Sequence, residues 1–163
     1  MLVAAVALFA AAQAEPLDPD LACIVDRIPA ATRAATIAEA MSGTGGRVRD
    51  AFRQATDACA RDRAWAADYA AAAGRIAMAL VLGEEAEAVL RQNEIPPDLI
   101  HNWFAAQSAD VRRSEPSDEI GTALIEHVQA QGIPLARLQA QGTIIGVMLG
   151  ALNKIERIGA GLE

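Results

Sequence analysis

The sequence has few of the residue types that favour β-sheet. Aromatic residues make up 4% of its 163 residues, and the β-branched residues are outnumbered by alanine, which accounts for about a quarter of the chain. Alanine has the highest intrinsic helix propensity and is depleted in strands. The composition therefore disfavours a β-sandwich or barrel. It predicts an all-α, single-domain helical bundle.

Residues that carry most enzyme chemistry are also scarce. Two histidines and two cysteines are too few for a zinc site built from Cys and His side chains. The chain contains neither a nucleotide-binding fingerprint nor a serine-nucleophile motif. We therefore predict no catalytic residue, no metal site and no cofactor, and we expect a binding protein rather than an enzyme.

Basic residues are fewer than acidic residues. Twenty-one acidic residues against 14 basic ones give a net charge of -7, and the basic residues form no cluster along the sequence. Proteins that bind nucleic acid or anionic lipid neutralise phosphates with a surplus of Lys and Arg. The sequence therefore argues against nucleic acid and anionic lipid as partners.

An apolar run at the N-terminus is typical of a secretory signal peptide. Residues Leu2 to Ala12 are uncharged and apolar, and Ala12-Gln13-Ala14 forms a cleavage site before a polar stretch. Eleven apolar residues span about 16 Å as a helix, half of a bilayer core, which argues against a membrane anchor. We predict a signal peptide over 1–14, a single all-helical domain over 15–163, and a periplasmic or secreted location. A misassigned start codon and a retained anchor remain as alternatives.

If the protein is exported, we expect a disulfide between Cys23 and Cys59. Oxidising compartments favour disulfide formation, and two cysteines have one intramolecular connectivity. Thirty-five residues separate them, unlike the Cys-x-x-Cys of catalytic dithiols. The alternative is two buried free thiols.

Apolar periodicity and helix-breaking residues predict six to eight helices. Asp18-Pro19 starts the first helix, Gly83 ends a central one or begins a new one, and Ile133-Pro134 starts a last helix that continues to about Ile158. The polar segment 108–116 is predicted to be a long mobile loop.

Gly142, Gly146 and Gly150 recur every four residues in an apolar segment. Such a stripe permits close helix packing. We predict that it packs inside the domain, so that Gly146→Leu would unfold the protein. The alternative is a homodimer contact.

Two hypotheses for function follow. In the first, an exported, non-enzymatic module binds a protein or envelope component through a surface that includes Trp103 and Phe104. In the second, a small-molecule-binding or enzymatic bundle uses an interhelical pocket near Trp65, Tyr69 and His127. The sequence does not identify the partner.

Overall fold

A computed structural model describes residues 17–43 and 45–162, and this part of the chain contains helices and no strands. The predicted all-α, single-domain fold is confirmed. The predicted signal peptide and its cleavage site lie outside the described residues. The helices in chain order are α1 (Pro19–Val25), α2 (Ala30–Ser42), α3 (Gly46–Arg63), α4 (Ala67–Gln92), α5 (Pro97–Ala105), α6 (Ala109–Arg113), α7 (Asp118–Ala130), α8 (Leu135–Ala140) and α9 (Gly142–Gly159).

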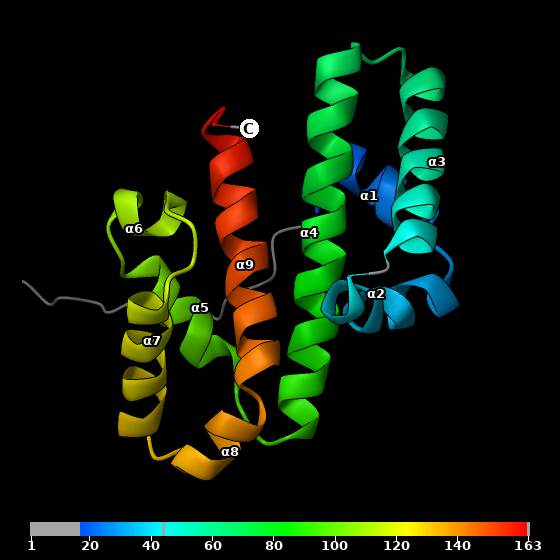
Figure 1. Cartoon of the computed structure of the whole chain (residues 1–163). Helices are drawn as coiled ribbons and strands as arrows, with labels where there is room; N and C mark the ends of the chain where they lie inside the picture. The colour runs from blue at the N-terminus through cyan, green and yellow to red at the C-terminus, as the bar shows by residue number, and fades with distance from the viewer. Residues whose placement is uncertain (1–16, 44, 163) are drawn as a thin grey trace, which may run out of the picture.

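The long helix α4 lies at the centre of the molecule (Figure 1). Helices α3 and α4 form an antiparallel hairpin, α1 crosses behind it, and α2 packs near its lower end. On the other side, α9 runs antiparallel to α4, and α5 to α8 pack around α9. None of the described helices covers the face of α4 between α3 and α9 (Figure 1).

The core consists of two clusters of buried apolar side chains, one on each side of α4. The N-terminal cluster joins α1, α3 and the first half of α4, with Phe52 and Ile24 fully buried. The C-terminal cluster joins the second half of α4 to α5, α7, α8 and α9, with Leu90 and Leu124 fully buried. Helix α4 therefore contributes to both cores.

Several helix boundaries follow from local chemistry. The Asp18 side chain accepts a hydrogen bond from the Asp20 backbone N–H, and Pro19 takes the first helical position of α1. Helix α3 ends at Ala64, whose φ of 54° lies in the left-handed region. Helix α4 continues through Gly83 without a break, because α9 packs against this position: a Cβ there would lie 3.6 Å from that of Ala151.

The predicted last helix is in fact two helices. Gln141 leaves helical geometry with φ of -108° and ψ of 10°, ending α8 and preceding α9. This break, together with the short helix α6, gives the described chain one helix more than the predicted upper limit.

The prediction of a long loop over 108–116 is wrong. Ser108 caps α6 by accepting a hydrogen bond from the backbone N–H of Val111. The buried side chain of Asn153 then donates hydrogen bonds to the carbonyl oxygens of Arg112, at 2.7 Å, and Ser114. These bonds hold the segment against α9.

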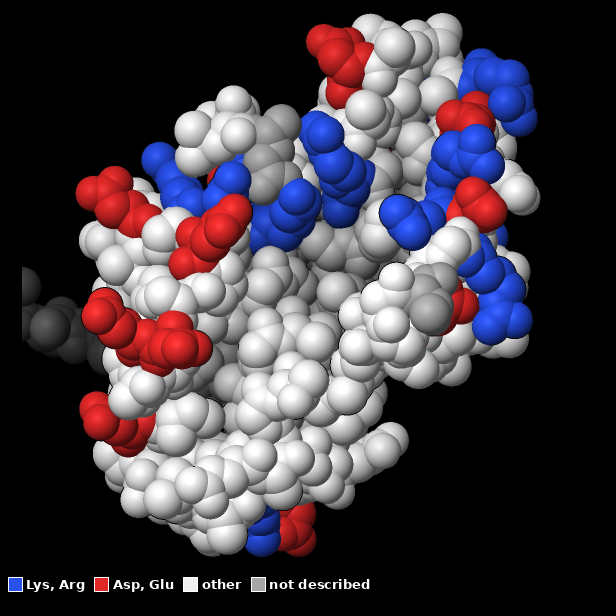
Figure 2. Space-filling view, in the orientation of Figure 1, with Lys and Arg blue, Asp and Glu red and all other residues white. Residues whose placement is uncertain are grey.

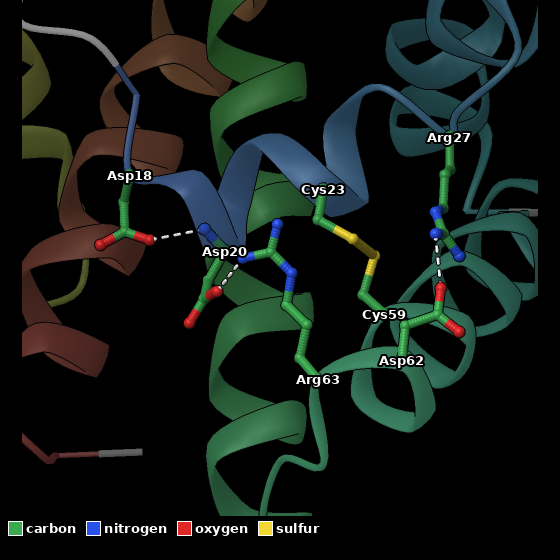
Figure 3. The surroundings of a disulfide bond; sticks show 7 residues. All are labelled: Asp18, Asp20, Cys23, Arg27, Cys59, Asp62 and Arg63. Carbon is green, nitrogen blue, oxygen red and sulfur yellow. Dashed lines mark hydrogen bonds and ion pairs between the residues drawn. A yellow bond between two sulfur atoms is a disulfide. The ribbon is translucent and has the colours of Figure 1, made fainter.

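The predicted disulfide between Cys23 and Cys59 is confirmed, and it joins α1 to α3 with the two Cα atoms 6.2 Å apart (Figure 3). An ion pair to α3 lies on each side of it, one from α1 and one from the turn that follows α1. Arg27 pairs with Asp62 at 2.7 Å, and Asp20 pairs with Arg63. Cys59 is fully buried, so the bridge forms part of the N-terminal core.

Candidate binding groove

The uncovered face of α4 forms one wall of a groove of about 840 Å³ between α3 and α4. Its floor is apolar and made mostly of small residues. The floor residues include Phe52, Ala67, Ala70, Ala71, Gly74 and Met78. The groove follows α3 from Gly46 to Arg61, a length of about 22 Å at 1.5 Å per residue.

Two helices approach each other closely at the bottom of this groove. A Cβ on Gly74 of α4 would lie 2.7 Å from Oγ1 of Thr56 on α3. Thr56 is buried, and its hydroxyl has no hydrogen-bond partner among the described residues. The absence of a side chain at position 74 therefore sets the separation of the α3–α4 hairpin.

Arginines form the rim of the groove. Arg49, Arg53 and Arg61 belong to α3, and Arg75 belongs to α4. Two carboxylates, Asp50 and Asp57, also lie along α3, which leaves the lining with more positive than negative groups.

The rim arginines differ in how far they are already paired. Arg53 pairs with Asp50 at 2.9 Å, and Arg49 donates from Nε to the carbonyl oxygen of Gly45 at 3.2 Å. Arg61 and Arg75 make no hydrogen bond or ion pair with any residue that the structure describes. Both side chains are exposed, so their guanidinium groups can accept an anionic ligand.

Two smaller hollows extend the groove. One, of about 330 Å³ between α4 and α9, shares Arg75 and Met78 with it and adds Lys154 to the basic rim. The other, of about 300 Å³, lies toward α2 and shares Arg49 and Met78. Arg75 thus lies on the ridge between two apolar hollows.

Charge is unevenly distributed over this face of the molecule. Lysine and arginine side chains line the upper part of the hollow between α9 and α3, with acidic side chains among those over α3, and further acidic side chains gather on the side of α6 and α7 (Figure 2). The protein as a whole carries a net charge of -7. The groove is therefore a locally basic site on an acidic protein.

The end of the groove is tied to α1. Trp65 lines the groove and packs edge-on against Tyr69, with ring centroids 5.3 Å apart. The Tyr69 hydroxyl donates a hydrogen bond of 2.8 Å to Asp20. This hydrogen bond and the neighbouring Arg63 lower the pKa of the Asp20 carboxyl, and the same hydrogen bond raises the pKa of Tyr69.

The predicted pocket near Trp65, Tyr69 and His127 is not formed by those three residues. His127 lies on α7, which packs against α5 and α8, whereas Trp65 and Tyr69 lie at the α3–α4 turn. Tyr69 is 46% exposed and points toward α1, away from the groove lining. Of the three residues, only Trp65 lines the groove.

The predicted interaction surface at Trp103 and Phe104 is also wrong. Each side chain is 8% exposed and belongs to the C-terminal core. Four apolar residues of α5 fall on one face, and burial of that face against α7 and α9 takes both rings out of contact with a partner.

The glycines of α9 do not provide the predicted close packing. A Cβ on Gly142, Gly146 or Gly150 would meet no atom within 4 Å in the described structure. The close approaches occur instead at Gly74 and Gly83 of α4, where no glycine pattern is visible in the sequence. Gly150 lines the hollow between α4 and α9.

The basic rim of the groove was not predicted from the sequence. Arg49, Arg53 and Arg61 share one face of α3 at intervals of four and eight residues, and this helical spacing is the one signal that could have indicated it. Arg75 and Lys154 come from two other helices, and only the packing of α4 and α9 brings them to the same groove.

Two further features are absent from the described residues. In 17–43 and 45–162, no three His, Cys, Asp or Glu side chains are grouped so that they could hold a metal ion. None of the helices described there combines the length and the hydropathy needed to cross a bilayer.

No protein-family model matches the chain, and neither a curated protein nor a solved structure matches it. The function proposed for the chain therefore depends on the geometry of the groove.

Proposed function

We propose that this chain is an exported, non-enzymatic binding protein, and that its recognition site is the arginine-rimmed groove between α3 and α4. The observation that supports the proposal most directly is Arg75. Its guanidinium lies at the edge of two apolar hollows and has no partner in the described structure. Concave apolar surfaces with a few convergent polar groups are the usual form of a ligand site.

Export is supported by the disulfide, because such bridges persist in oxidising compartments and are rare in reducing ones. The apolar run over Leu2 to Ala12 supports it independently. The partner is a protein or envelope component, as expected from the sequence, and it binds in the groove instead of at Trp103 and Phe104.

Site-specific photocrosslinking in the native host tests the proposed site. Ala71 is exposed on the groove floor, and replacing it with benzoylphenylalanine places a photoreactive group inside the groove. Ala130, the last residue of α7, is also exposed and gives a matched control outside the groove. We expect ultraviolet light to yield a discrete adduct at position 71 and none at position 130.

Fractionation of the same cells checks export. The adduct and the mature chain should be found outside the cytoplasm, with the mature chain two mass units lighter than its reduced form. No adduct at position 71, or equal labelling at both positions, would contradict the proposed site. Recovery of a reduced chain in the cytoplasm would contradict export.

A further inference from the structure

The distribution of charge along the groove indicates what kind of ligand it takes. Arg49 and Arg61 stand twelve residues apart on α3, which separates their Cα atoms by about 18 Å along the helix axis. Arg53 lies between them, and Arg75 faces them from α4. The positive groups therefore extend along the groove and do not converge on one point.

A single-chain lipid carries its charge in one headgroup, so its site needs cations at one end of an apolar channel. A ligand that satisfies arginines along the whole groove needs anionic groups at intervals along its length. It also needs an apolar face to cover the floor formed by Ala70, Ala71 and Met78. An amphipathic helix with an acidic polar face has both properties.

The dimensions of the groove agree with a helix. A length of about 22 Å corresponds to about 15 helical residues, or four turns. The floor consists largely of alanine and glycine, and small residues let a second helix approach closely. Helix α4 already has α3 on one side and α9 on the other, so a docked helix would complete a four-helix arrangement on its uncovered face (Figure 1).

We infer that the groove binds an acidic amphipathic helix of a partner protein, with the apolar face of that helix on α4 and its carboxylates paired with Arg49, Arg53, Arg61 and Arg75. This inference rests on the proposed function of the groove. Two acidic residues lie on the α3 rim: Asp50 pairs with Arg53, and Asp57 occupies the turn between Arg53 and Arg61.

The test uses the full mature chain and a defined probe. The probe is a fluorescein-labelled peptide of 15 residues, with leucines on one helical face, glutamates on the other and alanines between. A second peptide has lysine in place of each glutamate, and a third has the composition of the first in an order that destroys the apolar face. Fluorescence anisotropy measures each dissociation constant.

We expect the acidic amphipathic peptide to bind most tightly, with an affinity that falls as salt is added. Combining Arg49→Glu with Arg75→Glu should weaken binding at least about tenfold. The control Arg91→Glu makes one such charge reversal on α4 outside the groove and should alter binding less than about twofold. Asp57→Arg should tighten binding, a gain that unfolding cannot produce.

Equal binding of the acidic and lysine peptides would overturn the inference, as would an Arg49→Glu, Arg75→Glu variant that binds normally. Vesicles of phosphatidylglycerol separate the remaining alternative. Arginine-dependent binding of these vesicles without binding of the acidic peptide would overturn the helix inference in favour of an anionic lipid. The groove would then remain a binding site, whereas loss of the photocrosslink at position 71 would contradict the proposed function as well.

Discussion

At the scale of single residues, Asp20 links three elements. Its carboxylate accepts a hydrogen bond from Tyr69 on α4 and pairs with Arg63 at the end of α3, while Asp20 itself stands in the first turn of α1. The ionised form of Asp20 is the form that makes these contacts. The charge of this half-buried side chain therefore helps to hold α1 against the hairpin, together with the disulfide.

Stability should depend on pH through this pair of residues. Folding lowers the pKa of Asp20 below its usual 3.8, so its contribution is present above that pH and is lost as the pH falls through the lowered pKa. Folding raises the pKa of Tyr69 above 10.0, so that contribution is present below pH 10.0 and is lost as the pH rises through the raised pKa. Urea midpoints measured between pH 2 and 6 should fall more steeply in the wild type than in Asp20→Asn.

Asp98→Asn is the matched control, because Asp98 is also an acidic residue in the first turn of a helix. It should leave the acid dependence of the urea midpoint close to that of the wild type. If the urea midpoints of the wild type and of Asp20→Asn fall equally as the pH is lowered, the role assigned to Asp20 is contradicted.

At the scale of helices, the glycines show what a sequence pattern can and cannot predict. The interval of four residues in α9 correctly indicates that Gly142, Gly146 and Gly150 share a face. It does not indicate whether another helix covers that face, and none of the described helices comes within 4 Å of a Cβ added there. The contact at Gly74 depends on Thr56 of α3, eighteen residues away, and no local pattern encodes it.

One substitution should therefore have opposite effects at two glycines. Gly146→Ala should raise the free energy of unfolding by about 1 kcal/mol, because alanine is the better helix former and the added methyl meets nothing. Gly74→Ala should lower it by about 1 to 3 kcal/mol, because the methyl would overlap Thr56. Urea denaturation followed by circular dichroism measures both.

A double-mutant cycle identifies the cause of the loss at position 74. Thr56→Ala removes the two side-chain atoms nearest to the new methyl, Oγ1 and Cγ2, so Gly74→Ala should cost less in that background. Strictly additive effects would show that the overlap is not responsible. The predicted unfolding by Gly146→Leu is replaced by an expectation that this variant folds.

The basic residues of the groove also fall into two groups: those whose shared helix face can be predicted from the sequence and those brought there by helix packing. The helical spacing of α3 places Arg49, Arg53 and Arg61 on one face, and this much was present in the sequence. Arg75 joins them only because the hairpin folds back, and Lys154 only because α9 packs against α4. Periodicity describes one helix at a time, so a site shared by three helices cannot be predicted from it.

At the scale of the whole molecule, the fold class and the disulfide were predictable for simple reasons. An alanine-rich composition favours helices in any arrangement, and two cysteines allow one pairing. The burial of Trp103 and Phe104 was not predictable in this way. An aromatic pair on a short helix can face either a core or a partner, and the packing of α5 decides between them.

Removing the disulfide should destabilise the protein substantially. The bridge closes a loop with a sequence separation of 36, for which the chain-entropy model gives about 3 to 4 kcal/mol. We expect the double variant Cys23→Ala, Cys59→Ala to lose about this much, as measured by urea denaturation. Dithiothreitol should reproduce the loss in the wild type and have no effect on the variant, and a wild type insensitive to reduction would contradict a stabilising bridge.

The core is divided into two clusters, and only one of them contains the disulfide. The disulfide lies in the N-terminal cluster, whereas the cluster around Leu90 and Leu124 has no covalent cross-link. Amide hydrogens of α1 and α3 should therefore lose their protection against exchange with deuterium when the bridge is reduced, while those of α7 retain theirs. Because α3 also forms one wall of the groove, reduction should weaken ligand binding there.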